Sequence, residues 1–566
     1  MPQPDPQTDW WRDAVIYQVY PRSFADSDGD GTGDLPGVTA RLEHLAALGV
    51  DGLWLSPFYR SPLHDGGYDV ADYRDVDPRF GTLADIDALI ARAGELGLRV
   101  LIDLVPNHSS SEHPWFQAAL AAAPGTPERG RYLFRDGRGA SGELPPNNWR
   151  SVFGGAGWTR VTDPDEQPGQ WYLHLFDDTQ PDLDWSNDEV RAEMESVLRF
   201  WLDRGVAGFR VDVAHGLVKA DGLPDAPPHA IVDALDEMAG DREPVATALT
   251  PYWDQDGVHE VYAAWRRVLD SYPGPQRVLC GEAWVHPPER LALYLRPTEM
   301  HQCFEFDFLQ SAWDATQLRV AITEGLTSMA AVGAPVTWVL SNHDVVRHPS
   351  RYGLPDDAPF PRGIRAGDPQ PDEALGLRRA RAATALMLAL PGAAYLYQGE
   401  ELGLPEHTSL ADEWRDDPVW RRSGGRETGR DGCRIPLPWK AAEPGMGFSP
   451  TGRTWLPQPT SYAAYAADVQ DGEPGSTLEL YRTLLRLRRK HRLGRGELSW
   501  LDAPAGVLRF GNANVEVIVN VNADPFALQT DSLVLVASGP LAESKDADGG
   551  SSVAVPADTA AWIQLG

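Results

Sequence analysis

The chain of 566 residues carries 82 acidic and 50 basic side chains, and its formal net charge of −32 argues against nucleic acids and anionic membrane surfaces as partners. Hydrophobic residues make up 42% of the chain, which is long enough for several folded domains with sizeable cores. Three cysteines, Cys280, Cys303 and Cys433, are too few and too scattered for a disulfide framework or a thiolate metal site.

The start of the chain, through Asp13, is acidic and rich in proline. It has neither the basic stretch nor the apolar stretch of a secretory signal, and no window approaches eighteen uninterrupted apolar residues. We therefore expect a cytoplasmic protein without membrane contacts. A monomer is the default expectation, since the sequence carries no sign of the oligomeric state.

Short apolar segments alternate with amphipathic helical patterns along most of the chain. We expect strands at residues 14–21, 50–58, 99–108, 205–216, 277–284, 336–344 and 393–401, and a weaker one from Cys303. Helices are expected at residues 37–49, 82–97, 188–205, 375–392 and 476–491, with Thr82 placed to cap the second. Strand–helix alternation repeated about eight times predicts parallel strands, either in a (β/α)8 TIM barrel or in a doubly wound sheet.

Polar residues stand at the carboxyl ends of these strands, where a barrel builds its active site: Asp103, His108, Asp212, Glu282, His343 and Asp344. In the stretch GVAGFRVDVAHG, Arg210 and Asp212 lie two residues apart, so they point to the same side of a strand. Taken alone, this pair fits a structural buried ion pair equally well. Because other strand ends also carry carboxylates and histidines, we interpret the set as a site on a barrel formed by residues 1–106 and 181–492.

Two segments depart from the strand–helix pattern. Residues 107–180 are rich in Gly, Pro, Trp and Asn and are too long for an ordinary connection, which predicts a small inserted domain over the barrel mouth after the third strand. Residues 493–566 show short alternating apolar runs, which predict a C-terminal all-β domain with a β-sandwich fold.

Three of the strand-end residues, Asp212, Glu282 and Asp344, suit the hydrolysis of glycosidic bonds. In that reaction one carboxylate attacks the anomeric carbon, a second protonates the leaving oxygen, and others stabilise an oxocarbenium-like transition state. Arg210 is placed to favour the ionised form of Asp212. The alternative is a set of unrelated solvated carboxylates at loop starts, which their coincidence at separate strand ends disfavours.

Several motifs resemble, in order and spacing, those of the α-amylase family of glycoside hydrolases (family 13). Four of its motif regions are matched by DLVPNH (103–108), GFRVD (208–212), GEAW (281–284) and SNHD (341–344). A fifth is matched by QPDLDW (180–185), whose form resembles the oligo-1,6-glucosidase and α-glucosidase branch. YQVYPRSF near the start, GGYDVADY (66–73) and YQGEELG (397–403) are similar to the same branch, so the resemblance spans nearly the whole chain.

This resemblance implies Asp212 as the nucleophile, Glu282 as the general acid and base, and Asp344 as the transition-state carboxylate. It also implies residues that line the pocket for the terminal glucose: Asp65, Tyr68, His108, Arg210 and His343. Arg434, in GCRIPLPW, matches the arginine of the family's RTPMQW stretch only loosely. From the inserted domain, Phe153, Phe176 and Gln180 are candidates for the pocket wall or for the neighbouring sugar, with core packing as the alternative.

A second chemical signal is DSDGDGTGD, Asp26 to Asp34, where oxygen donors alternate with glycines as in the first part of an EF-hand loop. The twelfth position is Gly37 instead of Glu, and the flanks predict a strand and then a helix, so this is no EF-hand. The segment resembles the α-glucosidase loop that binds Ca²⁺ or Mg²⁺. We expect a structural ion there, held by Asp26, Asp28, Asp30, the carbonyl of Thr32, and Asp34.

Three functions remain in view. The first is a retaining, exo-acting α-glucosidase that releases glucose from maltose, isomaltose or short α-glucans through a glucosyl–Asp212 intermediate, with no redox cofactor. The second is a transglucosylase or a sucrose or maltose isomerase with the same three carboxylates. The third, a non-enzymatic scaffold, is disfavoured because all three carboxylates are present.

Two signals in one segment point to different preferred linkages. In the α-glucosidase branch, valine after the nucleophile, here Val213, is associated with α-1,6 linkages. The continuation AHGLVKADGLPD resembles actinobacterial α-glucosidases that prefer α-1,4 linkages. We therefore expect a preference for α-1,4.

Overall fold

In the computed structural model, which describes residues 9–163, 166–227, 250–545 and 551–565, eight parallel strands close into a barrel in the order β1-β13-β12-β11-β10-β9-β5-β2. They are β1 (Val15–Val19), β2 (Gly52–Leu55), β5 (Arg99–Leu104), β9 (Gly208–Val211), β10 (Val278–Gly281), β11 (Gln302–Glu305), β12 (Thr337–Val339) and β13 (Ala393–Tyr397). Pairing of β1 with β13 closes the ring. The predicted TIM barrel is confirmed, and the doubly wound sheet is excluded. The weak candidate at Cys303 is β11.

Large side chains fill the barrel. The ring of Trp54 on β2 lies 5.9 Å from the ring of Phe304 on β11 and 6.3 Å from that of Tyr395 on β13. Because β2 pairs with neither of these strands, the three rings meet inside the barrel. They form a packed floor beneath the carboxyl ends of the strands.

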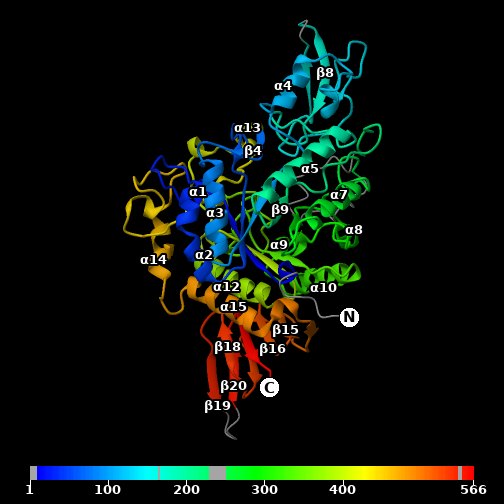
Figure 1. Cartoon of the computed structure of the whole chain (residues 1–566). Helices are drawn as coiled ribbons and strands as arrows, with labels where there is room; N and C mark the ends of the chain where they lie inside the picture. The colour runs from blue at the N-terminus through cyan, green and yellow to red at the C-terminus, as the bar shows by residue number, and fades with distance from the viewer. Residues whose placement is uncertain (1–8, 164–165, 228–249, 546–550, 566) are drawn as a thin grey trace.

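Helices surround the barrel (Figure 1). Outside the inserted segment, the α-helices of the described residues are α1 (Leu35–Ala40), α2 (Leu42–Leu48), α3 (Leu83–Glu95), α5 (Asp188–Asp203), α7 (Val258–Asp270), α8 (Pro288–Leu293), α9 (Phe306–Gln310), α10 (Ala315–Ala331), α11 (His348–Arg351), α12 (Glu373–Ala389), α13 (Pro418–Arg422), α14 (Ala467–Gln470) and α15 (Thr477–His491). The expected helix at 37–49 is divided at Arg41, whose backbone leaves the helical region. Thr82 caps α3 in a capping box with Asp85, as predicted.

The sequence of α5 shows why these helices form and how they pack. At the start of the helix, Asn187 accepts a hydrogen bond from the N–H of Glu189. The negative charges of Asp188 and Glu189 interact favourably with the positive end of the helix dipole. Its buried residues recur at helical spacing on one face: Val190, Met194, Val197, Leu198, Trp201 and Leu202. Burial of each such side chain contributes roughly 1.5–3 kcal/mol.

The segment between β5 and α5 forms a separate lobe at the upper right of Figure 1. It holds α4 (Pro114–Ala121) and a sheet of β6 (Phe134–Arg135), β8 (Pro168–Leu173) and β7 (Trp158–Thr162), in that order. All four elements lie within the predicted 107–180 segment, whose bounds stay a prediction. A short hairpin, β3 (Tyr59–Arg60) and β4 (Asp72–Val76), follows β2.

The chain ends in two antiparallel sheets at the bottom of Figure 1. One contains β14 (Leu498–Trp500), β15 (Val507–Asn512), β16 (Val515–Asn520), β21 (Thr559–Gln564) and β18 (Val534–Ala537), and the other β17 (Phe526–Gln529), β20 (Ser551–Val555) and β19 (Ala542–Lys545). Val507, Ile518 and Val555 belong to one apolar cluster joining the sheets. Trp562 donates to the carbonyl of Ala385 on α12 at 3.0 Å. The predicted all-β C-terminal domain is confirmed.

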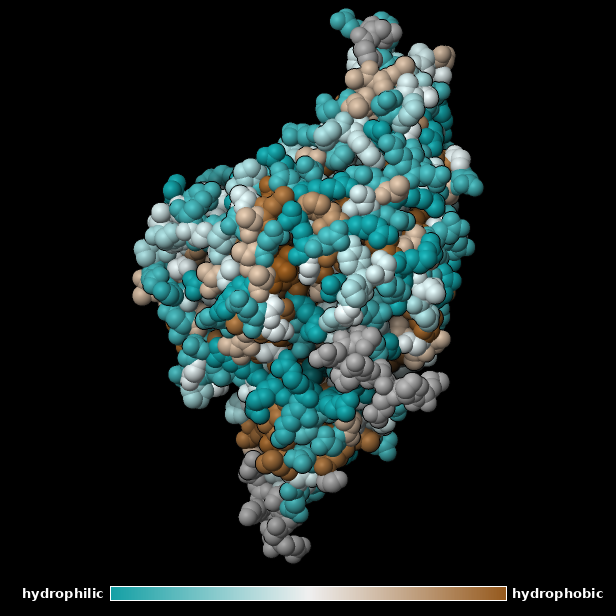
Figure 2. Space-filling view, viewed as in Figure 1, coloured by the Kyte–Doolittle hydropathy of each residue, from teal (hydrophilic) through white to brown (hydrophobic). Residues whose placement is uncertain are grey.

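Hydrophilic residues cover most of the face shown in Figure 2. Among the described residues, no helix combines the length and the apolar character needed to cross a membrane. The expected cytoplasmic location and monomeric state stay predictions. Residues 1–8, which belong to the predicted barrel unit, lie outside the described part of the chain.

Candidate active site

A pocket lies at the carboxyl ends of the barrel strands. Asp212 and Glu282 directly follow β9 and β10, and Asp344 lies in the loop after β12. Eight of the twelve residues predicted for catalysis or substrate binding line this pocket in the described structure: Asp65, Tyr68, His108, Phe153, Phe176, Asp212, Glu282 and Asp344. The other four, Gln180, Arg210, His343 and Arg434, stand behind them and contact them.

Arg210, the arginine inside a buried strand, joins the carboxylates at the base of the pocket. Its guanidinium lies 2.7 Å from Asp212, 2.9 Å from Glu282 and 3.0 Å from Asp103. The guanidinium carbon lies 4.9 Å from the centre of the Trp54 ring on the barrel floor. One buried cation therefore contacts both Asp212 and Glu282, which places the two carboxylates together at the base of the pocket.

Electrostatics differ sharply between two of these carboxylates. Burial raises the pKa of Asp212 well above its usual value, with Arg210 opposing the shift and Glu282 adding to it. Burial would also raise the pKa of Asp344, but His343, Arg430 and Arg434 outweigh it and hold this pKa below its usual value. Asp344 therefore stays ionised, whereas the ionised form of Asp212 depends on the guanidinium beside it.

Glu282 is held by hydrogen bonds to both carboxylate oxygens. The N–H of Val213 donates to Oε2 at 3.0 Å, and Nε1 of Trp284 donates to Oε1 at 3.0 Å. Trp284 is itself stacked on Phe306, with ring centroids 3.8 Å apart. Val213 has a backbone φ of +44°, a left-handed conformation that costs about 1–3 kcal/mol in a β-branched residue. Backbone strain is thus stored where the chain aims an N–H at Glu282.

Arg430 also lines the pocket, and sequence analysis missed it. Its guanidinium lies 2.6 Å from Asp65, 2.9 Å from Asp344 and 2.5 Å from Asp417. Arg434, which was expected in the pocket, also reaches Asp344 at 3.0 Å but donates its Nε to the carbonyl of His343 at 2.8 Å. Of these two arginines, only Arg430 lines the pocket in the described structure.

The family model of the α-amylase catalytic domain matches residues 18–496. The chain belongs to the α-amylase family of glycoside hydrolases. It is 39% identical over 536 residues to a probable α-glucosidase of Rhizobium meliloti, an alignment that covers 92% of this chain and 90% of that protein. The predicted family is therefore confirmed, while the particular likeness to actinobacterial members stays a prediction.

Solved structures of the family include enzymes with other names. The structure of an α-glucosyl transfer enzyme, XgtA, superposes with a TM-score of 0.81 at 36% identity, covering 98% of this chain and 99% of that one. The trehalulose synthase MutB from Pseudomonas mesoacidophila MX-45 superposes with a TM-score of 0.81 at 30% identity, with coverages of 98% and 99%. This glycoside hydrolase therefore shares its whole architecture with proteins named for glucosyl transfer and for sugar synthesis.

The remaining predicted residues of this family member surround the same pocket. Gln180 donates to Asp65 at 3.1 Å and lies 3.1 Å from Nε2 of His108. Tyr68 stacks on His343 with ring centroids 5.1 Å apart and nearly parallel planes. Phe153 and Phe176 pack edge to face, with ring centroids 5.6 Å apart, and form part of the pocket wall.

Sequence analysis also missed Trp253 and Phe360, two aromatic residues that line the pocket. Both come from long loops without a motif, and their aromatic character alone does not separate them from the other tryptophans and phenylalanines of the chain. The signal for Arg430 was stronger. It stands four residues before Arg434 in the stretch GRDGCR, so that stretch held two candidate arginines.

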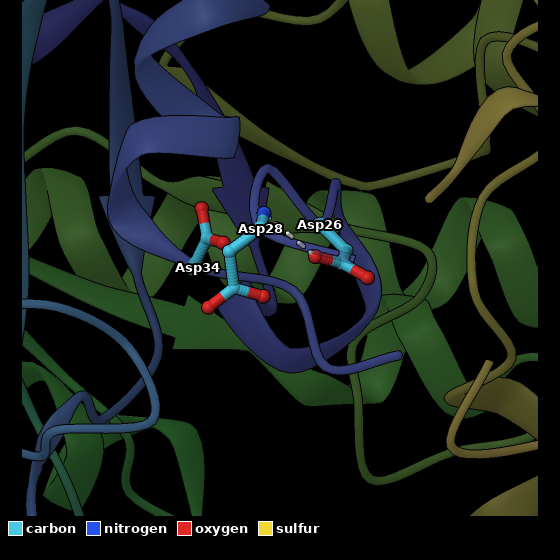
Figure 3. Close-up of side chains that lie close together, drawn as sticks. All are labelled: Asp26, Asp28 and Asp34. Carbon is cyan, nitrogen blue, oxygen red and sulfur yellow. Dashed lines mark hydrogen bonds between the residues drawn. The ribbon is translucent and has the colours of Figure 1, made fainter. Parts of the chain in front are cut away.

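The acidic loop between β1 and α1 brings three carboxylates together (Figure 3). Oxygen atoms of Asp26, Asp28 and Asp34 lie within 4.8 Å of one another in the described structure. Asp30, which was expected to complete the ion site, does not belong to this group of carboxylates, and the role of the Thr32 carbonyl stays a prediction. Both oxygens of Asp26 accept backbone N–H groups, from Gly29 at 2.7 Å and Gly31 at 2.8 Å. The loop is therefore folded around its own carboxylates.

Proposed function

We propose that this glycoside hydrolase is a retaining, exo-acting α-glucosidase that releases terminal α-glucose from maltose and short malto- or isomalto-oligosaccharides. The observation that carries the proposal is the single Arg210 guanidinium shared by Asp212 and Glu282 at the base of one pocket. Two carboxylates bound by one guanidinium lie near each other, which favours a double displacement over an inverting reaction that needs room for a water between them.

In this proposal Asp212 attacks the anomeric carbon of the terminal glucose while Glu282 gives its proton to the leaving glycosidic oxygen. The bond from that oxygen to the anomeric carbon breaks as the ester to Asp212 forms. Water then gives a proton to Glu282 and attacks the same carbon, which restores the free Asp212 carboxylate and yields α-glucose. Asp344 and Asp65, with Arg430 between them, are assigned to the hydroxyls of that glucose.

Transfer of the glucosyl group to a sugar is the second candidate, with isomerisation of a disaccharide as its special case. It is supported by the likeness to an α-glucosyl transfer enzyme and to a trehalulose synthase. Phe153, Phe176, Trp253 and Phe360 line the pocket and offer aromatic faces on which an acceptor sugar can stack. The acceptor alone distinguishes the two reactions, because both use the same glucosyl–Asp212 ester.

The test is to follow maltose, isomaltose and sucrose separately by proton NMR. We expect the glucose of sucrose to appear first as the α-anomer and to convert to the β-anomer only at the rate of mutarotation. Maltose should be consumed faster than isomaltose, and their reducing-end glucose is released as a mixture of anomers. Oligosaccharides that grow with sugar concentration would favour transfer, and conversion of sucrose to another disaccharide would favour isomerisation. Initial release of β-glucose from sucrose, or from an aryl α-glucoside, would contradict the double displacement, because these substrates contain no glucose other than the transferred one.

We further propose that Asp26, Asp28 and Asp34 hold a Ca²⁺ or Mg²⁺ ion with a structural role. The donor set fits, because carboxylate oxygens are the ligands that these hard cations prefer, and Asp28 stays accessible to solvent. A bound cation would supply positive charge to a crowded acidic loop. None of the three lines the substrate pocket in the described structure, so no catalytic step is assigned to the ion.

Removal of this ion is expected to lower Tm by roughly 2–5 °C, since a ligand at a hundred times its Kd stabilises by about 2.7 kcal/mol. Thermal unfolding in chelator, followed by addition of Ca²⁺ or Mg²⁺, measures the shift. Asp28→Asn should abolish the response, whereas the exposed Asp178→Asn should keep it. If chelation leaves the Tm of the wild-type protein unchanged, and neither variant responds to added Ca²⁺ or Mg²⁺, the ion site is refuted.

A further inference from the structure

Lys219 is buried beside the pocket, and three chain segments surround its ammonium. Only 3% of its side chain is exposed, and Nζ lies 2.8 Å from Asp182 and 2.8 Å from the side-chain oxygen of Asn107. Nζ also donates to the carbonyl of Gly216. Asn107 follows β5, Asp182 follows the inserted segment, and Gly216 lies in the loop after β9. One cation therefore ties together the three segments that form one side of the site.

The bond to Gly216 holds the turn that carries Val213. The N–H of Gly216 donates to the carbonyl of Val213 at 2.9 Å, and the N–H of Ala214 donates to the carbonyl of Glu282 at 2.8 Å. A Cβ on Gly216 would lie 2.7 Å from both the Trp253 and Val213 side chains, so this turn is tightly packed. Because Val213 is strained, contacts of this kind are needed to keep its N–H on the Glu282 carboxylate.

The other two bonds reach the sugar-binding side of the pocket. The amide of Asn107 donates to Asp182 at 3.1 Å and lies 3.2 Å from Nδ1 of His108, which lines the pocket. The second oxygen of Asp182 accepts the N–H of Leu175 at 2.8 Å. Without the ammonium, the buried Asp182 carboxylate loses its only charged partner among the described residues, and the orientation of Asn107 loses one of its supports.

We propose that Lys219 is a positioning residue for catalysis, which locks the Val213 turn so that Glu282 keeps the orientation needed to protonate the leaving oxygen. The inference rests on the proposed function, in which Glu282 is the general acid and base. It differs from a purely structural role, in which Lys219 only balances the charge of Asp182. The two differ in one measurable respect, the dependence of the defect on the leaving group.

The experiment compares wild type and Lys219→Met on maltose and on 2,4-dinitrophenyl α-glucoside, whose leaving group departs without a proton. A misplaced acid slows only the reaction that needs it, so we expect kcat on maltose to fall roughly 10- to 100-fold. For the aryl glucoside, the rate constant for formation of the glucosyl ester should change less than about threefold. It is measured from the pre-steady-state burst of released dinitrophenol. Lys440→Met, which removes an exposed lysine paired with Glu443 at 2.7 Å, is the matched control and should leave both rates unchanged.

Since Lys219→Met leaves Asp182 unpaired, the double variant Lys219→Met/Asp182→Asn keeps the site neutral and is measured alongside, with near-ultraviolet circular dichroism as the check of folding. Equal losses on both substrates in a folded variant, or no loss on maltose, would overturn the positioning role. If wild type cleaves neither substrate, the proposed function fails and takes the inference with it. If wild type cleaves both substrates, a failed prediction counts against the positioning role of Lys219 and leaves the proposed function intact.

Discussion

Asp212→Asn is expected to lower kcat on maltose by roughly 10⁴-fold or more. The asparagine amide does not form the glucosyl ester, so the variant loses the covalent pathway that splits the reaction into two easier steps. The side chain keeps its size, and its contact with Arg210 weakens without a steric change. The measurement is initial glucose release under saturating maltose, with intact-mass analysis after rapid quenching for the covalent glucosyl adduct.

The adduct should appear on wild type with a slowly released aryl glucoside and be absent from Asp212→Asn. Asp178→Asn is the matched control, since this carboxylate is largely exposed and its one ion pair among the described residues is with Arg422, at 4.0 Å. Activity of Asp212→Asn within about tenfold of wild type would remove the nucleophile from the proposal, because triad-type nucleophiles contribute far more than that.

The barrel was predictable because each strand carries its own signal. Runs such as VLI in β5 and AAYLY in β13 are apolar on both faces, as strands beneath a layer of helices must be. The weak candidate was β11, whose Glu305 is buried at the end of the strand and whose burial raises its pKa to about 8. A carboxyl group held neutral in this way fits a buried strand, but in the sequence the glutamate interrupts the apolar run that predicts such a strand.

The residues of the candidate site were likewise predictable in part. Asp212 and Glu282 were predictable because barrel geometry takes every strand end to one face, whatever the loops do. Arg430 and Phe360 lie in long loops, and their approach to the pocket depends on contacts far along the chain, such as that of Arg430 with Asp65. The role of Val213 depends on a backbone angle that its side chain disfavours, so local propensity points away from it.

Arg430→Met is expected to lower kcat/KM on maltose by roughly 10²- to 10³-fold at neutral pH, because removal of one partner from buried ion pairs leaves carboxylates uncompensated. Asp65, Asp344 and Asp417 all lose a contact of 2.9 Å or less. Arg509→Met, in the C-terminal domain and paired with Glu516 at 2.7 Å, is the matched control and should leave kcat/KM unchanged.

The loss should also depend on pH, in a direction that follows from Asp344. Arg430 is one of the groups that hold the pKa of Asp344 below its usual value, so its removal raises that pKa. Asp344 acts as the ionised form, which is present above its pKa, and the acidic limb of the kcat/KM profile should therefore move to higher pH in the variant. Arg434→Met removes a second contact to the same oxygen, so it should move the limb in the same direction while Asp65 keeps its partner. An acidic limb that stays in place in both variants would contradict this prediction and would show that a group of higher pKa, such as Asp212, governs that limb.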